Sequence, residues 1–152
     1  MSLSMLLIPM SIAVVTTIMD AAEHINNHYS ANANEIQNVP TKFINQSLLM
    51  KTLDDHGIRF TQTDDNTIIC DMNDSQIIYH RNSQDEPFLM GVKGHFNMEQ
   101  LMCNIKAIET EFDGNLQTYS YNRVMNNIPE GMHLESEEIL EDNSIIITLG
   151  ED

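Results

Sequence analysis

Two histidines in the segment EHINNH, His24 and His28, lie four residues apart, the spacing that a metal site on one helix face requires. A zinc-dependent protease motif needs a glutamate directly after the first histidine, but Ile25 stands there. The sequence indicates no third ligand. We therefore predict a solvated polar face, with a metal-dependent enzyme built on His24 and His28 as an alternative.

Other residue types that could carry chemistry occur in patterns with a simpler explanation. The neighbouring acids Asp54 and Asp55 lie at the end of a predicted helix, and Asp64 and Asp65 lie in a predicted turn. Catalytic carboxylates instead converge from separate elements onto a cleft. The stretch GVKGH has two glycines but no phosphate-binding loop after it, and the chain has no nucleophile elbow. We predict no catalytic residue, no cofactor and a function other than catalysis.

The two cysteines, Cys70 and Cys103, show no metal-ligand spacing and are too few for a disulfide framework. Each lies in an apolar run, TIICDM or QLMCNI, which favours a reduced and buried thiol. Reduced thiols are typical of the cytoplasm, and we predict that location.

Acidic residues dominate the charge of the chain, with 23 Asp and Glu against seven Lys and Arg and a net charge of -16. Between Glu130 and Asp152 there are eight acids and neither Lys nor Arg. Such a surface repels phosphate groups, which argues against direct binding of nucleic acid. The acids form either a solvated face or a surface that docks a basic partner or mimics nucleic acid.

The opening MSLSMLLIPMSIAVVTTIM contains no charged side chain. Pro9 divides this run, and no Lys or Arg precedes Lys42, which weakens both a membrane span and a secretion signal. The apolar pattern predicts one helix from about Met10 to Tyr29 that is buried either in its own domain or in a groove of a partner. Membrane attachment through residues 1–19 and a cleaved signal remain alternatives. The predicted partner-binding stripe consists of Ile12, Val15, Met19 and Ala22.

The middle of the chain alternates between helix and strand signals. We predict a helix over NQSLLMKTLDDHGI that ends at Gly57, then a hairpin that turns at residues 64–66, and two strands, SQIIYHRN and PFLMGVKG. A second helix begins after Asn97 and ends before Gly114, and a shorter helix covers NLQTYSYNRVMNNI. The inner face of the second helix is predicted to be Leu101, Ile105, Ile108 and Phe112, with Glu109 on the surface.

These signals predict four parts. Residues 1–30 form an apolar or amphipathic helical segment, residues 31–41 a linker, residues 42–128 an α+β core and residues 129–152 an acidic hairpin that turns at residues 141–143. The predicted fold is a ferredoxin-like two-layer sandwich with an N-terminal apolar helix and a C-terminal hairpin.

The run from Val39 to Ile128 resembles the conserved plastid reading frame thirty-five family of cyanobacteria, plastids and bacteria, a domain of unknown function. The segments that carry this resemblance are PTKFINQSLLMKTLDDHGI, FTQTDDNTIICDM, QIIYHRN and NLQTYSYNRVMNNI, and LEDNSIIITL is similar to a hairpin that accompanies the family. The resemblance implies a ferredoxin-like α+β fold and no defined catalytic residues. Because relatives tend to be encoded beside AAA-type ATPases of the MoxR kind, it also implies an accessory role.

Together these features predict a non-enzymatic accessory or adaptor protein that acts through contacts with a protein partner or with other copies of itself. The apolar helix and a sheet edge are the expected contact surfaces. An acidic inhibitor that occludes a basic groove is the second hypothesis. The metal-dependent enzyme is the third.

Overall fold

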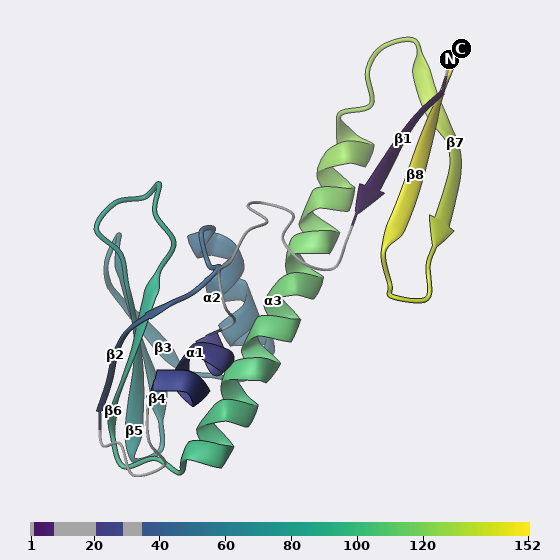
Figure 1. Ribbon diagram of the computed structural model, residues 1–152. Helices are drawn as coiled ribbons and strands as arrows, with labels where there is room; N and C mark the ends of the chain where they lie inside the picture. The colour runs from purple at the N-terminus through teal and green to yellow at the C-terminus, as the bar shows by residue number, and fades with distance from the viewer. Residues whose placement is uncertain (1, 8–20, 29–34) are drawn as a thin grey trace. The chain divides into compact units, whose positions relative to one another are not determined.

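The computed structural model of the chain describes residues 2–7, 21–28 and 35–152. The chain divides into two compact units, one of Val15–Phe112 and one of Met1–Val14 with Asp113–Asp152. The long helix α3 (Met98–Asn126) supplies its first part to one unit and its second part to the other. Figure 1 shows both units, and each is described in turn.

The larger unit contains a five-stranded antiparallel sheet with the strand order β2-β6-β5-β4-β3. Helices α1 (Ala21–His28), α2 (Gln46–Asp55) and the first part of α3 lie on one side of this sheet (Figure 1). A mixed α+β fold is therefore confirmed. The strands are β2 (Glu35–Pro40), β3 (Phe60–Asp64), β4 (Thr67–Met72), β5 (Ser75–His80) and β6 (Leu89–Gly94).

Alternate residues of the central strands form the core of this unit, because successive side chains of a strand point to opposite faces of the sheet. The predicted inner face of α3 is confirmed, since Leu101, Ile105, Ile108 and Phe112 are all buried. Phe43 packs at the centre, with its ring 4.7 Å from that of Phe112 and 5.7 Å from that of Tyr79. The buried strand residues are Ile36, Val39, Ile68, Cys70, Ile77, Tyr79, Met90 and Val92.

Polar residues and a glycine set the ends of the helices and a turn, and Asn97, Gly57 and the turn at residues 64–66 do so as predicted. The side chain of Asn45 accepts a hydrogen bond from the amide of Leu48 at 3.0 Å, and Asn97 accepts one from Gln100 at the start of α3. Gly57, with φ of 73°, follows α2 in the left-handed conformation that stops a helix. The turn between β3 and β4 is held by a 2.7 Å bond from the amide of Asn66 to Asp64.

A buried arginine joins three parts of the larger unit. The guanidinium of Arg81 donates to the carbonyl oxygen of Ile44 at 2.9 Å, to Gln46 Oε1 at 3.1 Å and to Asn66 Oδ1 at 3.3 Å. Its central carbon also lies 4.3 Å from the centre of the Phe88 ring. Arg81 is 4% exposed, so its charge is accommodated by neutral oxygens and an aromatic face.

The smaller unit is a three-stranded antiparallel sheet with the order β1-β8-β7, formed by β1 (Ser2–Leu7), β7 (Met132–Ile139) and β8 (Ile145–Glu151). The central strand β8 buries Ile147 and Leu149. Tyr121 in the second part of α3 donates to Glu137 of β7 at 2.7 Å. Strands β7 and β8 form the predicted C-terminal hairpin, and β1 completes its sheet.

The N-terminal segment differs from the helix predicted for residues 1–30. Residues Ser2–Leu7 form strand β1, which pairs with β8 from Ser2 opposite Gly150 to Leu7 opposite Ile145. A continuous apolar run does not distinguish a buried strand from a helix, so the pairing with β8 decides the conformation. The later residues Ala21–His28 do form a helix, α1, while the rest of the predicted Met10–Tyr29 helix lies outside the described residues.

The predicted linker, residues 31–41, contains the edge strand β2. Ile36 and Val39 are both fully buried, although they are three residues apart. Between them the register with β6 shifts by one residue, and Asn38 adopts a positive φ of 54°. This bulge turns both apolar side chains inward and breaks the two-residue period, which is why the segment resembles a linker in sequence.

The predicted boundaries of the core, residues 42–128, also differ from those of the structure. The helix predicted to end before Gly114 continues to Asn126 as one helix of 29 residues. A glycine inside a helix weakens it by about 1 kcal/mol but does not end it. The larger unit therefore ends at Phe112, within α3, and residues after it belong to the smaller unit.

The connectivity of the larger unit differs from the ferredoxin-like arrangement. That arrangement has the element order β-α-β-β-α-β. Here β2 and α2 precede four consecutive strands, β3 to β6, and α3 follows them. The four strands form a meander, and β2 adds to its β6 edge. No strand after α3 returns to this sheet, because β7 and β8 pair with β1 instead.

Candidate functional site

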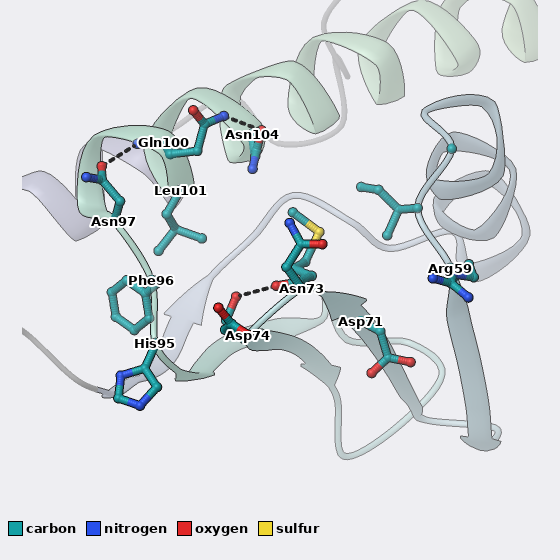
Figure 2. A pocket seen from close by; sticks show the side chains of 14 residues that line it. Arg59, Asp71, Asn73, Asp74, His95, Phe96, Asn97, Gln100, Leu101 and Asn104 are labelled. Carbon is teal, nitrogen blue, oxygen red and sulfur yellow. Dashed lines mark hydrogen bonds between the residues drawn. The ribbon is translucent and has the colours of Figure 1, made fainter.

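A polar hollow of about 520 Å³ lies at one end of the five-stranded sheet (Figure 2). It is formed by the loop after α2, the turn between β4 and β5, and the connection from β6 to α3. The GVKGH stretch ends β6 and begins that connection at His95, as predicted for a strand end that leads to a helix. The side chains labelled in Figure 2 include Arg59, Asp71, Asp74, His95, Asn97, Gln100 and Asn104.

The hydrogen bonds in this hollow hold its turns and helix end. Asn97 caps α3 through the amide of Gln100 at 3.0 Å, and Gln100 donates to Asn104 at 3.3 Å. Asp71 accepts a 3.1 Å bond from Gln76 of the neighbouring strand. Asp71 and Asp74 line the same hollow as Arg59, so charges of both signs occur in it. We assign no catalytic role to these residues.

The two histidines that could bind a metal both lie on the short helix α1. His24 is half-buried. Within residues 2–7, 21–28 and 35–152, no group of three His, Cys, Asp or Glu side chains is close enough to hold an ion. The metal hypothesis therefore gains no third ligand from the described part of the chain.

The predicted partner-binding residues are only partly described. Ile12, Val15 and Met19 lie outside the described residues, and Ala22 lies within α1. Ile25, which continues the same apolar stripe, is fully buried in the larger unit. The end of the stripe is thus covered by the chain itself, while its role in docking a partner stays a prediction.

The two thiols differ in their surroundings. Burial raises the pKa of Cys70 to about 12, and the charge of Asp71 contributes to this shift as the smaller cause. The thiol is therefore protonated and unreactive at neutral pH. Burial also raises the pKa of the neighbouring Tyr79. Cys103 lies on the outer side of α3 and is exposed, so the predicted burial of this thiol is wrong.

Glu109 is a buried residue that the sequence pattern placed on the surface. It is 5% exposed, and its carboxyl accepts a hydrogen bond from the amide of Ala21 at 2.8 Å. The amides of the first helical turn have no partner within their own helix, and a carboxylate is favoured there by the helix dipole. Glu109 therefore attaches the start of α1 to α3, and the prediction of a solvated side chain is wrong.

The edge strand β7, whose sequence is MHLESEEI, is largely exposed. Every residue of β7 after Met132 is exposed, including two large apolar side chains, Leu134 at 37% and Ile139 at 66%. Among the described residues β7 pairs only with β8, so its other edge presents unpaired backbone groups. The sequence predicted the hairpin that contains this surface. The alternation of its side chains does not show, however, which of the two strands lies at the edge of the sheet.

Acidic side chains surround this open edge. Glu135 accepts a 2.8 Å bond from the Ser2 hydroxyl, and Glu137 accepts the bond from Tyr121. Both donors are neutral, so these contacts leave the negative charges uncompensated. Arg123 is the only Lys or Arg in the two segments of the smaller unit, which contain nine Asp and Glu residues.

No helix in the described ranges is both long and apolar enough to cross a membrane. No protein-family model matches the chain, and no curated protein or solved structure matches it.

Proposed function

We propose that the protein is a non-enzymatic accessory or adaptor protein that acts through protein–protein contacts. The observation that carries this proposal is the exposed edge strand β7, with Leu134 and Ile139 beside its unpaired backbone groups. Monomeric proteins protect such edges, and an edge that also exposes large apolar side chains is suited to strand addition by a partner. The family resemblance suggests an AAA-type ATPase as that partner.

The test is recovery of the partner from the source organism with the tagged full chain. Proteins that co-purify are quantified by mass spectrometry for wild type and for Ile139→Lys, with Thr61→Lys as the matched control. Thr61 is also exposed and lies on an edge strand, β3, of the other sheet. We expect one defined partner to be lost from Ile139→Lys alone. Equal recovery of every protein with wild type, Ile139→Lys and Thr61→Lys would contradict the proposal.

A second function is favoured by the acidic character of the β7–β8 hairpin. Its exposed carboxylates Glu135, Glu137 and Glu138 resemble a row of phosphates in charge, which suits an inhibitor that occludes a basic groove. In that case the recovered partner is a nucleic-acid-binding protein, and addition of duplex DNA displaces it. A partner that is not displaced by DNA favours the adaptor role.

A further inference from the structure

We infer that the partner of the β7 edge is an extended basic segment, which pairs with the strand through its backbone and with the acidic side chains through Lys or Arg. This inference rests on the proposed function, because it specifies the chemistry of the partner at the same surface. It depends on the register of β7, on the placement of its side chains and on the charge of the unit.

The register of β7 limits where a partner strand can pair. Between Leu134 and Ser136 the pairing with β8 shifts, so Glu135 is the extra residue of a bulge. A bulge twists a strand and disrupts its regular hydrogen bonding. From Ser136 to Ile139 the pairing is continuous, with Ser136 opposite Thr148 and Ile139 opposite Ile145. This four-residue stretch is the part of the edge that can accept another strand in regular register.

The side chains along this stretch alternate between the two faces of the sheet. Glu137 and Ile139 share the face of the buried Ile147, because directly paired residues of antiparallel strands point to the same side. Ser136 and Glu138 occupy the opposite face. An added strand therefore meets one carboxylate on each face and one large apolar side chain, Ile139, which is 66% exposed. Lys or Arg on both faces, with an apolar residue near Ile139, complements this pattern.

Charge also decides against a second copy of the chain as the occupant. If the β7 strands of two copies paired, the carboxylates of Glu137 and Glu138 would lie beside those of the other copy. Like charges directly opposite each other in a sheet are destabilising. Arg123 is the only Lys or Arg that the sequence of the smaller unit could offer in compensation. The acidic residues thus hinder self-association and at the same time favour a basic partner.

The inference is tested with the full-length protein and a fluorescein-labelled peptide of eight residues that alternates Lys and Val. Binding is measured by fluorescence anisotropy at low and high salt. A peptide of the same sequence with alternate backbone nitrogens methylated keeps its charge but cannot pair along a strand edge. Glu138→Lys removes one carboxylate from the edge, and Asp65→Lys makes the same charge change in the exposed turn of the other sheet.

We expect saturable binding that weakens at least tenfold for the methylated peptide and at least fivefold for Glu138→Lys, while Asp65→Lys binds as wild type. Equal binding of the two peptides, equal losses in the two variants, or absence of binding would each overturn the inference. If the peptide fails but a cellular partner still depends on Ile139, the adaptor role stands and only the basic-strand chemistry is wrong. If the peptide binds but no partner depends on Ile139, the adaptor role fails and the edge remains a basic-strand site.

Discussion

The carboxyl group of Glu109 accepts a hydrogen bond from the backbone amide of Ala21, across 88 positions of sequence and a distance of 2.8 Å. Both residues are buried. The contact joins the first turn of α1 to the middle of α3, so the N-terminal helix is held by the larger unit through a specific polar contact as well as through the burial of Ile25.

We predict that Glu109→Ala lowers the free energy of unfolding by about 1–3 kcal/mol, because it leaves a buried amide without its acceptor. Glu109→Gln retains a side-chain oxygen and is expected to cost less. Glu111 is exposed on the same helix, and Glu111→Ala should cost less than about 0.5 kcal/mol. Urea denaturation followed by circular dichroism measures all three, and equal costs for the two alanine variants would show that the buried contact contributes nothing.

Arg81 provides a test of how the parts of the larger unit are joined. We expect Arg81→Lys to be destabilised nearly as much as Arg81→Ala, because one ammonium group cannot replace a planar guanidinium that donates to Ile44, Gln46 and Asn66. The cost should be about 1–3 kcal/mol in each case, since buried oxygens lose their donors. Arg59→Lys, at an exposed position, is the control. If Arg81→Lys had the same free energy of unfolding as wild type, a positive charge alone would be sufficient to join these parts of the larger unit.

Gly114 lies inside α3, and an added Cβ there meets no atom within 4 Å. Gly114→Ala is therefore expected to raise the free energy of unfolding by about 1 kcal/mol, since alanine favours a helix more than glycine does. Thermal and urea denaturation measure the change. A destabilised variant would mean that α3 is interrupted at this glycine, as the sequence alone suggested.

The two cysteines should differ sharply in reactivity. At pH 8 we expect one equivalent of a thiol reagent to react rapidly with the folded protein, at the exposed Cys103, and a second only after denaturation. Cys103→Ser should therefore show no fast reaction. Rapid reaction of two thiols in the folded wild type would contradict the burial of Cys70.

The same thiol makes stability depend on alkaline pH. An unfolded cysteine has a pKa of about 8.5, whereas burial and the charge of Asp71 raise the pKa of Cys70 to about 12 in the folded protein. Between these values the unfolded chain binds fewer protons than the native one, so stability is lost as the pH rises. Cys70→Ala should lose less of its free energy of unfolding between pH 8 and pH 10 than wild type does. Identical losses would show that the thiol does not contribute.

Local signals predicted the parts of the fold that local chemistry determines. The turn at Asp64 and Asn66, the cap at Asn97 and the stop at Gly57 each depend on neighbouring backbone groups, and each is confirmed. The inner face of α3 followed from its 3.6-residue period. These features needed no knowledge of distant residues.

The features that sequence reasoning missed all depend on a distant partner. Ser2–Leu7 is a strand because β8, more than 130 residues later, pairs with it. Glu109 is buried because α1 presents an amide to it. For β7, the predicted hairpin did not indicate which strand is central, and that order makes β7 an edge. The candidate surface is thus a property of the sheet order and could not be derived from a local pattern.

Hydrogen exchange of the β7 amides tests most directly whether this edge is where a partner strand pairs. The full-length protein is compared with and without a saturating amount of the Lys-Val peptide, and exchange is resolved by residue with NMR. We predict slower exchange for outward amides within Ser136–Ile139, and unchanged exchange in β1, the other edge of the same sheet. Binding of the peptide without protection of β7, or with equal protection of β1, would contradict the account.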